Sequence, residues 1–240
     1  MCALCIVITA YSQSDSSIVK NKWSGSLSIG LNSSSGNINR FGSNSKLIVL
    51  LDQKKADWEL DIHFQNFFNN GVKLDETLES SILGIFKTNS KHRFYGKVSV
   101  YRNEFRGFSF QLKEGIGHLF KLVNKPAFSI GTRLGYQIRH NQIARGILNE
   151  FHDGTHHFAL FGARGTIPLM KNISADFQID HAQDFKGIDN HYFDILSTLT
   201  MKVNEIISVK MNHKYWYAGI PVTGRQAIDQ QFNGSIAFTF

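Results

Sequence analysis

The chain has little proline and cysteine, and it has no long apolar run. Its 240 residues include 3 prolines and 2 cysteines. A membrane-spanning helix needs about 18 or more consecutive, mostly apolar residues, and no segment approaches that length. Because proline is scarce and phenylalanine occurs 20 times, a disordered chain is also disfavoured. These features exclude a helical membrane protein and favour an ordered, aromatic-rich β protein.

Both cysteines lie in an apolar stretch at the start of the chain. Cys2 and Cys5 belong to the segment 1–10, which is apolar apart from Thr9, and Ala10-Tyr11-Ser12 has the small-x-small form of a signal-peptidase site. We therefore predict a secretory signal truncated at its start, since no basic n-region precedes the apolar part. The alternative is a short apolar strand. Removal of the signal leaves no cysteine, which excludes disulfides, thiol catalysis and thiolate metal sites.

The predicted organisation has three parts: a signal peptide (1–12), a short polar leader (13–21) and a single barrel domain (22–240). The chain is basic, with a formal net charge of +7. Its lysines and arginines stand mostly singly and form no dense run. This balance suits anionic lipid headgroups or anionic solutes, whereas nucleic-acid binding is disfavoured. We expect neither a cofactor nor a nucleic-acid partner.

Apolar and polar residues alternate along many segments, most clearly over 58–65. There Trp58, Leu60, Ile62 and Phe64 alternate with Glu59, Asp61, His63 and Gln65. Successive side chains of a strand point to opposite faces, so this segment is predicted to be a strand with one apolar and one polar face. The last segment, Gln231–Phe240, alternates in the same way and ends on an aromatic residue.

Twelve such strands can be placed along the chain, with turn-forming clusters between them. Tight turns follow the even-numbered strands, and the longest connections, 140–155, 181–190 and 216–229, follow strands 7, 9 and 11. Outer-membrane barrels combine short periplasmic turns with longer external loops in this way. An open sheet edge in lipid would leave backbone groups unpaired, so the sheet must close. We predict an all-β fold, a closed antiparallel up-and-down transmembrane β-barrel of twelve strands; a soluble lipid-binding β-barrel is the alternative.

The first predicted strand and the turn after it carry a family resemblance. Trp23–Gly30 reads Trp-Ser-Gly-Ser-Leu-Ser-Ile-Gly, and Ser35-Gly36-Asn37 follows it. This opening resembles that of the YdiY-like family of outer-membrane proteins described as salt-induced, which begin with a Trp-x-Gly strand and a Ser-Gly-Asn turn. The resemblance implies a barrel in the bacterial cell outer membrane over most of the mature chain. The family is a domain of unknown function, so it brings no catalytic or ligand residues to this chain.

The last strand resembles the closing strand of bacterial outer-membrane barrels, whose terminal aromatic residue is part of the assembly signal. The resemblance implies that Phe240 is read by the barrel-assembly machinery, and that outer-membrane lipids and lipopolysaccharide surround the barrel. Aromatic residues near predicted strand ends suit an interface girdle. These are Trp23, Trp58, Phe94, Tyr136, Tyr215 and Trp216.

Charged residues on the predicted lumen face are the main candidates for a solute path. They are Glu59, Asp61, Arg93, Lys97, Lys113, Arg133, Asp176, Asp180, Asp194, Lys210 and Lys214. Four of them, Arg93, Lys97, Lys113 and Arg133, are expected to form a basic wall without nearby acids, while Lys210 and Lys214 neutralise the acids of strands 9 and 10. In an open lumen this wall favours anions. In a narrow lumen, opposite charges interlock and fill the interior instead.

Two further clusters contain residue types that could form a metal site or a hydrolytic site. His152, Asp153, His156 and His157 are weak candidate ligands for a divalent metal, but a loop rich in these residues is more often simply solvated, so we predict no metal site. His181 and Asp184, with serine and asparagine nearby, are residue types that a hydrolytic site uses. No nucleophile motif accompanies them, so we predict no catalytic residues.

The sequence thus predicts an outer-membrane β-barrel and favours a narrow passive channel for small anionic solutes, because it contains a charged lumen face and no catalytic set. The alternatives are an outer-membrane enzyme, either a lipid hydrolase or a protease, and a plugged structural or adhesive barrel.

Overall fold

The computed structural model of the chain describes residues 22–35, 40–69, 72–89, 91–103, 107–125, 127–144, 152–222, 224 and 226–240. The predicted signal peptide and polar leader lie outside these residues. None of the described residues forms a helix long and apolar enough to cross a membrane.

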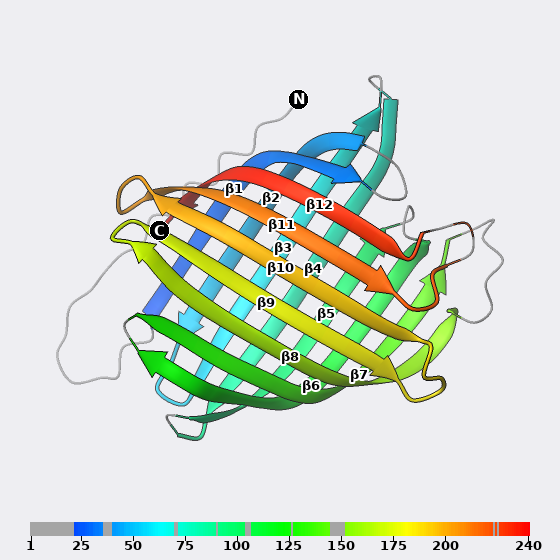
Figure 1. The fold of residues 1–240 in the computed structure, drawn as a ribbon, viewed down its shortest axis with the longest axis horizontal. Coiled ribbons are helices and arrows are strands. Elements are labelled where there is room, and N and C mark those ends of the chain that lie inside the picture. Colours follow the sequence, from blue (N-terminus) through cyan, green and yellow to red (C-terminus); the bar gives the residue numbers. More distant parts are fainter. Residues whose placement is uncertain are drawn as a thin grey trace.

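Twelve antiparallel strands form one closed barrel, in which each strand pairs with its neighbours in sequence and β12 pairs with β1. This confirms the predicted fold class (Figure 1). The strands are β1 (Lys22–Ser35), β2 (Arg40–Asp52), β3 (Ala56–Asn69), β4 (Val72–Lys87), β5 (His92–Asn103), β6 (Phe108–Lys125), β7 (Phe128–Ile143), β8 (Gly154–Met170), β9 (Ile173–Asp184), β10 (His191–Lys202), β11 (Ile207–Ala218) and β12 (Ile228–Thr239).

The barrel is apolar outside and polar inside, the reverse of a soluble core. On β3, Trp58 and Ile62 are exposed on the outer face, while Asp61 between them reaches Lys46 of β2 on the inner face, 2.8 Å away. Two-residue periodicity produces this division on every strand, because neighbouring side chains point to opposite sides. Closure removes the unpaired edge that lipid would not tolerate.

The two ends of the barrel differ in their connections. At one end, called the tight-turn end, strands are joined by the short segments 53–55, 88–91, 126–127, 171–172 and 203–206. At the other, the long-loop end, the longest connections are 144–153, 185–190 and 219–227, after β7, β9 and β11 as predicted. In Figure 1 the tight turns gather on the left and the longer connections on the right.

Two of the longer strands reach close to their neighbouring turns. β4 begins at Val72, and β8 runs through Pro168 to Met170. Pro168 pairs with Ser174, and the register shifts between Pro168 and Met170. A proline is tolerated where a bulge interrupts the ladder, because its missing N–H is not needed there.

The last strand closes on the first at the seam between β1 and β12. The Phe240 carbonyl accepts a hydrogen bond from Gly25 N at 2.8 Å, and Phe240 N donates to the Gly25 carbonyl at 3.0 Å. The ring of Phe240 lies on the outer face and is 57% exposed. The terminal residue therefore continues the ladder that closes the barrel.

Two aromatic residues, Phe108 and Trp216, lie inside the barrel. A register shift between Phe108 and Phe110 turns Phe108 into the lumen, where it is 3% exposed beside Tyr101 and Val222. Trp216, predicted in the girdle, pairs with Asp194 and Asp229 on the inner face and packs on buried side chains. Periodicity alone does not reveal a bulge, and it does not fix the face of a residue beside a long connection.

Candidate functional site: the charged lumen

The register places all eleven charged candidates on the inner face of the barrel. They do not act as separate walls of one sign. Arg133 Nη2 lies 2.7 Å from Asp180 Oδ1 on β9, and Arg93 Nη1 lies 3.7 Å from Asp57 Oδ2 on β3. The expectation that the basic wall lacks nearby acids is therefore wrong for Arg133 and Arg93.

A glycine makes the Arg133–Asp180 pair feasible. Gly162 of β8 lies between these two residues, opposite both of them in the register. A Cβ there would stand 2.3 Å from Asp180 Oδ1 and 2.8 Å from Arg133 Cγ. The missing side chain thus lets two charged groups meet across an intervening strand, a contact that strand alternation does not predict.

The middle of the lumen holds one acid among three lysines. Glu79 of β4 interacts electrostatically with Lys214, Lys113 and Lys97, which lie on β11, β6 and β5. Lys113 also lies over the Tyr101 ring, 5.2 Å from its centre. Lys214 therefore acts on Glu79 rather than only on the acids of β9 and β10. Glu79 itself was absent from the candidate set, although its inward position follows from the alternation of β4.

Toward the tight-turn end, the lumen contains a cavity of about 370 Å³ with a surplus of cations. Arg93, Lys121 and Arg164 line it together with one acid, Asp176. Asp176 Oδ1 accepts a hydrogen bond from Thr166 Oγ1 at 2.6 Å. Thr198, Gln178 and Ser129 contribute further polar groups, and Leu119 and Leu196 contribute apolar surface.

The three cavity cations repel one another. Lys121 interacts with Arg93 and Arg164, and Arg164 interacts with Arg93 and Arg133. In the part of the chain that the structure describes, neither Lys121 nor Arg164 has an ion-pair partner within 4.0 Å. Like charges held close together favour the uptake of an anion that relieves their repulsion.

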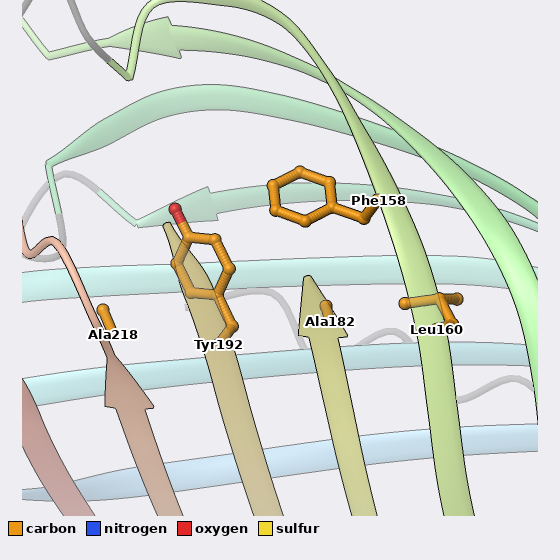
Figure 2. Close-up of a cluster of buried hydrophobic side chains, with 5 residues drawn as sticks. All are labelled: Phe158, Leu160, Ala182, Tyr192 and Ala218. Carbon is orange, nitrogen blue, oxygen red and sulfur yellow. The ribbon is translucent and has the colours of Figure 1, made fainter. Parts of the chain in front are cut away.

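The long-loop end of the lumen is filled by packed side chains. Figure 2 shows the aromatic lumen cluster, which consists of Phe158, Leu160, Ala182, Tyr192 and Ala218 from β8 to β11. The Arg139 guanidinium lies over two of its rings, 4.1 Å from the centre of Phe158 and 4.6 Å from that of Tyr192. A cation between two aromatic faces is attracted by both, and more strongly where water is excluded.

A buried polar network adjoins the aromatic lumen cluster. His156 Nδ1 lies 2.9 Å from Asp184 Oδ2, and the same oxygen accepts a hydrogen bond from Asn190 Nδ2. The second carboxylate oxygen accepts from Lys186 N at 2.9 Å. All acceptors of Asp184 are thus directed at protein groups, which fits a structural tie between β8, β9 and the 185–190 connection.

One connection folds across the mouth at this end. Val222, in the connection between β11 and β12, is 4% exposed and packs on Tyr101 and Phe108 of β5 and β6, on the opposite side of the barrel. His152, in the connection between β7 and β8, is hydrogen-bonded to the backbone of Ile220 and Pro221. The crossing segment, 219–222, is therefore fixed to both sides of the opening.

Burial lowers the pKa of His152, followed in effect by the charge of His156. The ring is 1% exposed, so its neutral form is favoured. The interpretation of 152–157 as a solvated loop is thus wrong for His152 and also for His156, which is 3% exposed.

The weak metal candidates are not brought together. His157 faces outward, where its Nδ1 is hydrogen-bonded to the Tyr136 hydroxyl, while its neighbour His156 faces inward. Asp153 Oδ1 accepts a hydrogen bond from Ile143 N at 3.2 Å. Among the described residues, no group of three or more His, Cys, Asp or Glu side chains is arranged to hold a metal ion.

The suggested hydrolytic pair is also divided between the two faces. His181 points outward beside His191, with ring centres 5.7 Å apart, whereas Asp184 points inward to His156. The His–Asp pair that does form, His156–Asp184, links strands whose partner residues are 28 positions apart. Sequence reasoning missed it because its members were assigned to two different clusters.

A closed sheet with an apolar exterior and a charged interior defines an outer-membrane type of β-barrel. Residues 27–240 match the family described as "Protein of unknown function, DUF481", and the chain belongs to this family. The YdiY-like resemblance of the first strand is consistent with this membership. A comparison with curated protein sequences gives no match.

Solved structures with the same fold are outer-membrane barrels. The NanC porin has a TM-score of 0.60 and 10% identity, covering 88% of this chain and 98% of its own. An outer-membrane channel from Pseudomonas putida F1 has a TM-score of 0.53 and 8% identity, covering 96% and 100%. The KdgM porin in complex with disordered oligogalacturonate has a TM-score of 0.51 and 8% identity, covering 89% and 99%. At these identities the likeness concerns the fold.

Proposed function

We propose that this protein is a narrow passive channel of the bacterial outer membrane that favours small anionic solutes. The observation that carries the proposal is the cavity toward the tight-turn end, where Arg93, Lys121 and Arg164 converge with one acid, Asp176. An anion entering this cavity gains charge-assisted hydrogen bonds and relieves the repulsion among the cations.

The other groups of the cavity suit a hydroxylated anion. Thr198, Gln178 and Ser129 offer donors and acceptors beside the cations, and Leu119 and Leu196 offer apolar surface for a ring face. Among the structural neighbours, the KdgM porin is in complex with oligogalacturonate, an acidic saccharide. We infer that small acidic sugars are the solute class for which these groups are best suited.

A second group of lumen cations supports the passage of anions. Lys97, Lys113 and Lys214 surround Glu79 between the cavity and the long-loop end, so a solute leaving the cavity meets a further surplus of positive charge. Conduction needs several sites that each bind weakly enough to release the ion. Glu79 supplies the competing charge that keeps the three lysines from holding an anion tightly.

The mouth at the long-loop end must open for a solute to pass. The crossing segment packs on Tyr101 and Phe108 through Val222 and is bonded to His152. We infer that this segment must be displaced for a solute to pass. The same observation favours a second candidate function, a plugged structural barrel.

The experiment that separates these functions is planar-bilayer conductance of the purified barrel. We expect discrete conductance steps. In a salt gradient, the reversal potential should shift toward the equilibrium potential of the anion. A silent bilayer would instead support the plugged barrel, and silence together with lipid hydrolysis or proteolysis would support an enzyme.

We also propose that the protein lies in the outer membrane, where lipid and lipopolysaccharide surround the barrel and the assembly machinery binds β12 with Phe240.

Ile62 lies on the exposed outer face and Asn212 on the inner face. Ile62→Arg should lower the free energy of unfolding from lipid vesicles by about 2–4 kcal/mol, the cost of a charge at mid-bilayer depth. Asn212→Arg is the matched control and should cost less. Equal costs in vesicle folding would contradict a lipid-facing outer surface.

A further inference from the structure

Exposed lysines surround the tight-turn end of the barrel. They form the lysine ring, which consists of Lys22, Lys54, Lys55, Lys91, Lys125, Lys171 and Lys202. Each of the five tight turns carries or adjoins at least one of them, and Lys22 begins β1 at the remaining position of the circle. The ring therefore extends around the full circumference of the closed sheet.

The backbone holds these turns in fixed positions beside one another. The Lys55 carbonyl accepts a hydrogen bond from Lys87 N at 2.9 Å, and the Lys91 carbonyl accepts from Lys121 N at 2.9 Å. Asn89 Oδ1 accepts from Lys91 N and His92 N within its own turn, at 2.9 and 2.7 Å. The spacing of the lysines is thus set by the barrel, while their side chains remain exposed.

Among the described residues, acidic side chains at this end form no close ion pair with the ring, although the charge of Lys22 acts on Asp52. Asp52 and Asp57 are occupied by Lys87, at 2.6 and 2.5 Å, and Lys87 is not a member of the ring. In the part of the chain that the structure describes, no ring lysine has an ion-pair partner within 4.0 Å. The ring is therefore a positively charged surface with spare donors.

The ring lies where the apolar outer surface ends. Trp23 follows Lys22 and is 66% exposed on the outer face. Trp58 packs edge-on against Phe86 with ring centres 5.8 Å apart, close to the 53–55 turn, and Met170 adjoins Lys171. Aromatic residues mark the membrane–water interface, and lysines just beyond them reach the headgroup layer.

We propose that the lysine ring binds the phosphates of anionic phospholipids in the leaflet around the tight-turn end. A lipid annulus contacts a barrel on every side, which matches a ring that continues around the whole circumference. A docked protein would contact one arc of it. The cations that serve the solute path, Arg93, Lys121 and Arg164, lie inside the lumen and are different residues. The proposal is thus independent of channel activity.

The test measures which lipids stay with the barrel. The full chain is purified from mixed vesicles of phosphatidylcholine and phosphatidylglycerol, and the retained lipids are quantified by mass spectrometry. The wild type should retain phosphatidylglycerol several-fold above its share in the vesicles, and added salt should reduce this enrichment because it screens exposed charges. A wild type that retains the two lipids in their original proportion would overturn the proposal.

Two variants with equal loss of charge locate the effect. Lys54→Gln, Lys91→Gln, Lys125→Gln and Lys171→Gln together remove four charges from the ring. Lys97→Gln, Lys113→Gln, Lys210→Gln and Lys214→Gln together remove four from the lumen. The ring variant should lose most of the enrichment, whereas the lumen variant should keep it. Equal enrichment in both variants would contradict the proposal, and so would a ring variant that changes only the anion preference in neutral bilayers. That last result would assign the ring to solute entry.

Discussion

The two ends of the barrel interior differ in what fills them. At the long-loop end, Phe158 and Tyr192 enclose the Arg139 guanidinium, and Val222 reaches across to Tyr101 and Phe108. Toward the tight-turn end, a cavity of about 370 Å³ remains between Arg93, Lys121 and Arg164. A cation held between aromatic faces is satisfied by protein groups, whereas Lys121 and Arg164 beside the cavity have no ion-pair partner among the described residues.

This difference separates two tasks within one sheet. The long-loop end has connections long enough to fold inward, and one of them crosses the mouth through Val222. The tight-turn end has connections of a few residues, which leave the interior open and the cations available. An arginine is thus enclosed by aromatic rings at one end, while arginines line a cavity at the other, according to what surrounds them.

The largest effect is expected from charging the closure. Val222→Asp places a carboxylate against Tyr101 and Phe108, where burial of an unpaired charge costs several kcal/mol, so the crossing segment should leave its site. Single-channel conductance should rise several-fold over the wild type. Ile188→Asp, in the exposed 185–190 connection, is the control and should leave conductance unchanged. Unchanged conductance for both would show that the crossing segment does not limit flow.

The next effect concerns the cavity. Lys121→Glu with Arg164→Glu changes the net charge of its four charged groups from +2 to −2, because three cations and one acid become one cation and three acids. The reversal potential in a salt gradient should change sign. Lys54→Glu with Lys171→Glu gives the same total change outside the lumen and should preserve anion preference. Lys97→Glu with Arg133→Glu is a less direct test, because Arg133 is paired with Asp180.

Acidification should weaken the closure moderately. Burial lowers the pKa of His152, so the unfolded segment binds more protons than the folded one once the pH falls below the ordinary histidine pKa of about 6.5. Stabilisation by neutral His152 is complete above that pH and is lost as the pH falls toward the lowered pKa. The charges of His156 and Asp184 act on the ring in opposite directions, with His156 the larger.

Open probability should therefore rise between neutral and mildly acidic pH in bilayer recordings. His152→Asn retains a polar side chain without a titrating ring, so this rise should be reduced in the variant. A variant with the wild-type pH profile would assign the response to other groups.

The smallest effect is that of salt on the selectivity of the open channel. Anion preference should decline as the salt concentration approaches about 1 M, where the Debye length is near 3 Å. The closure depends on packing and should respond much less. If open probability changed with salt as steeply as selectivity does, the closure would depend on electrostatics as the cavity does, and the proposed difference between the two ends would be wrong.

Alternation along the chain was sufficient to predict the barrel, its strand number and the faces of most residues. Trp58 and Ile62 face outward and Asp61 inward as expected, because side-chain direction in a strand is a local property of two-residue period. The connection lengths likewise indicated which end carries the long loops. Trp216 was misassigned and Phe108 faces inward, because an inward-folded connection and a bulge change the face of a residue without changing composition.

The partners of the lumen charges were decided by the tertiary structure. Arg133 meets Asp180 across Gly162, and Glu79 interacts electrostatically with Lys214 on the far side of the barrel. These contacts depend on register, on strand tilt and on how narrow the closed sheet is, and none of these is encoded in a single strand. The closure by Val222 and the cavity among Arg93, Lys121 and Arg164 have the same origin. The sequence determined which side chains enter the lumen, and the closing of twelve strands into one barrel determined which of them meet.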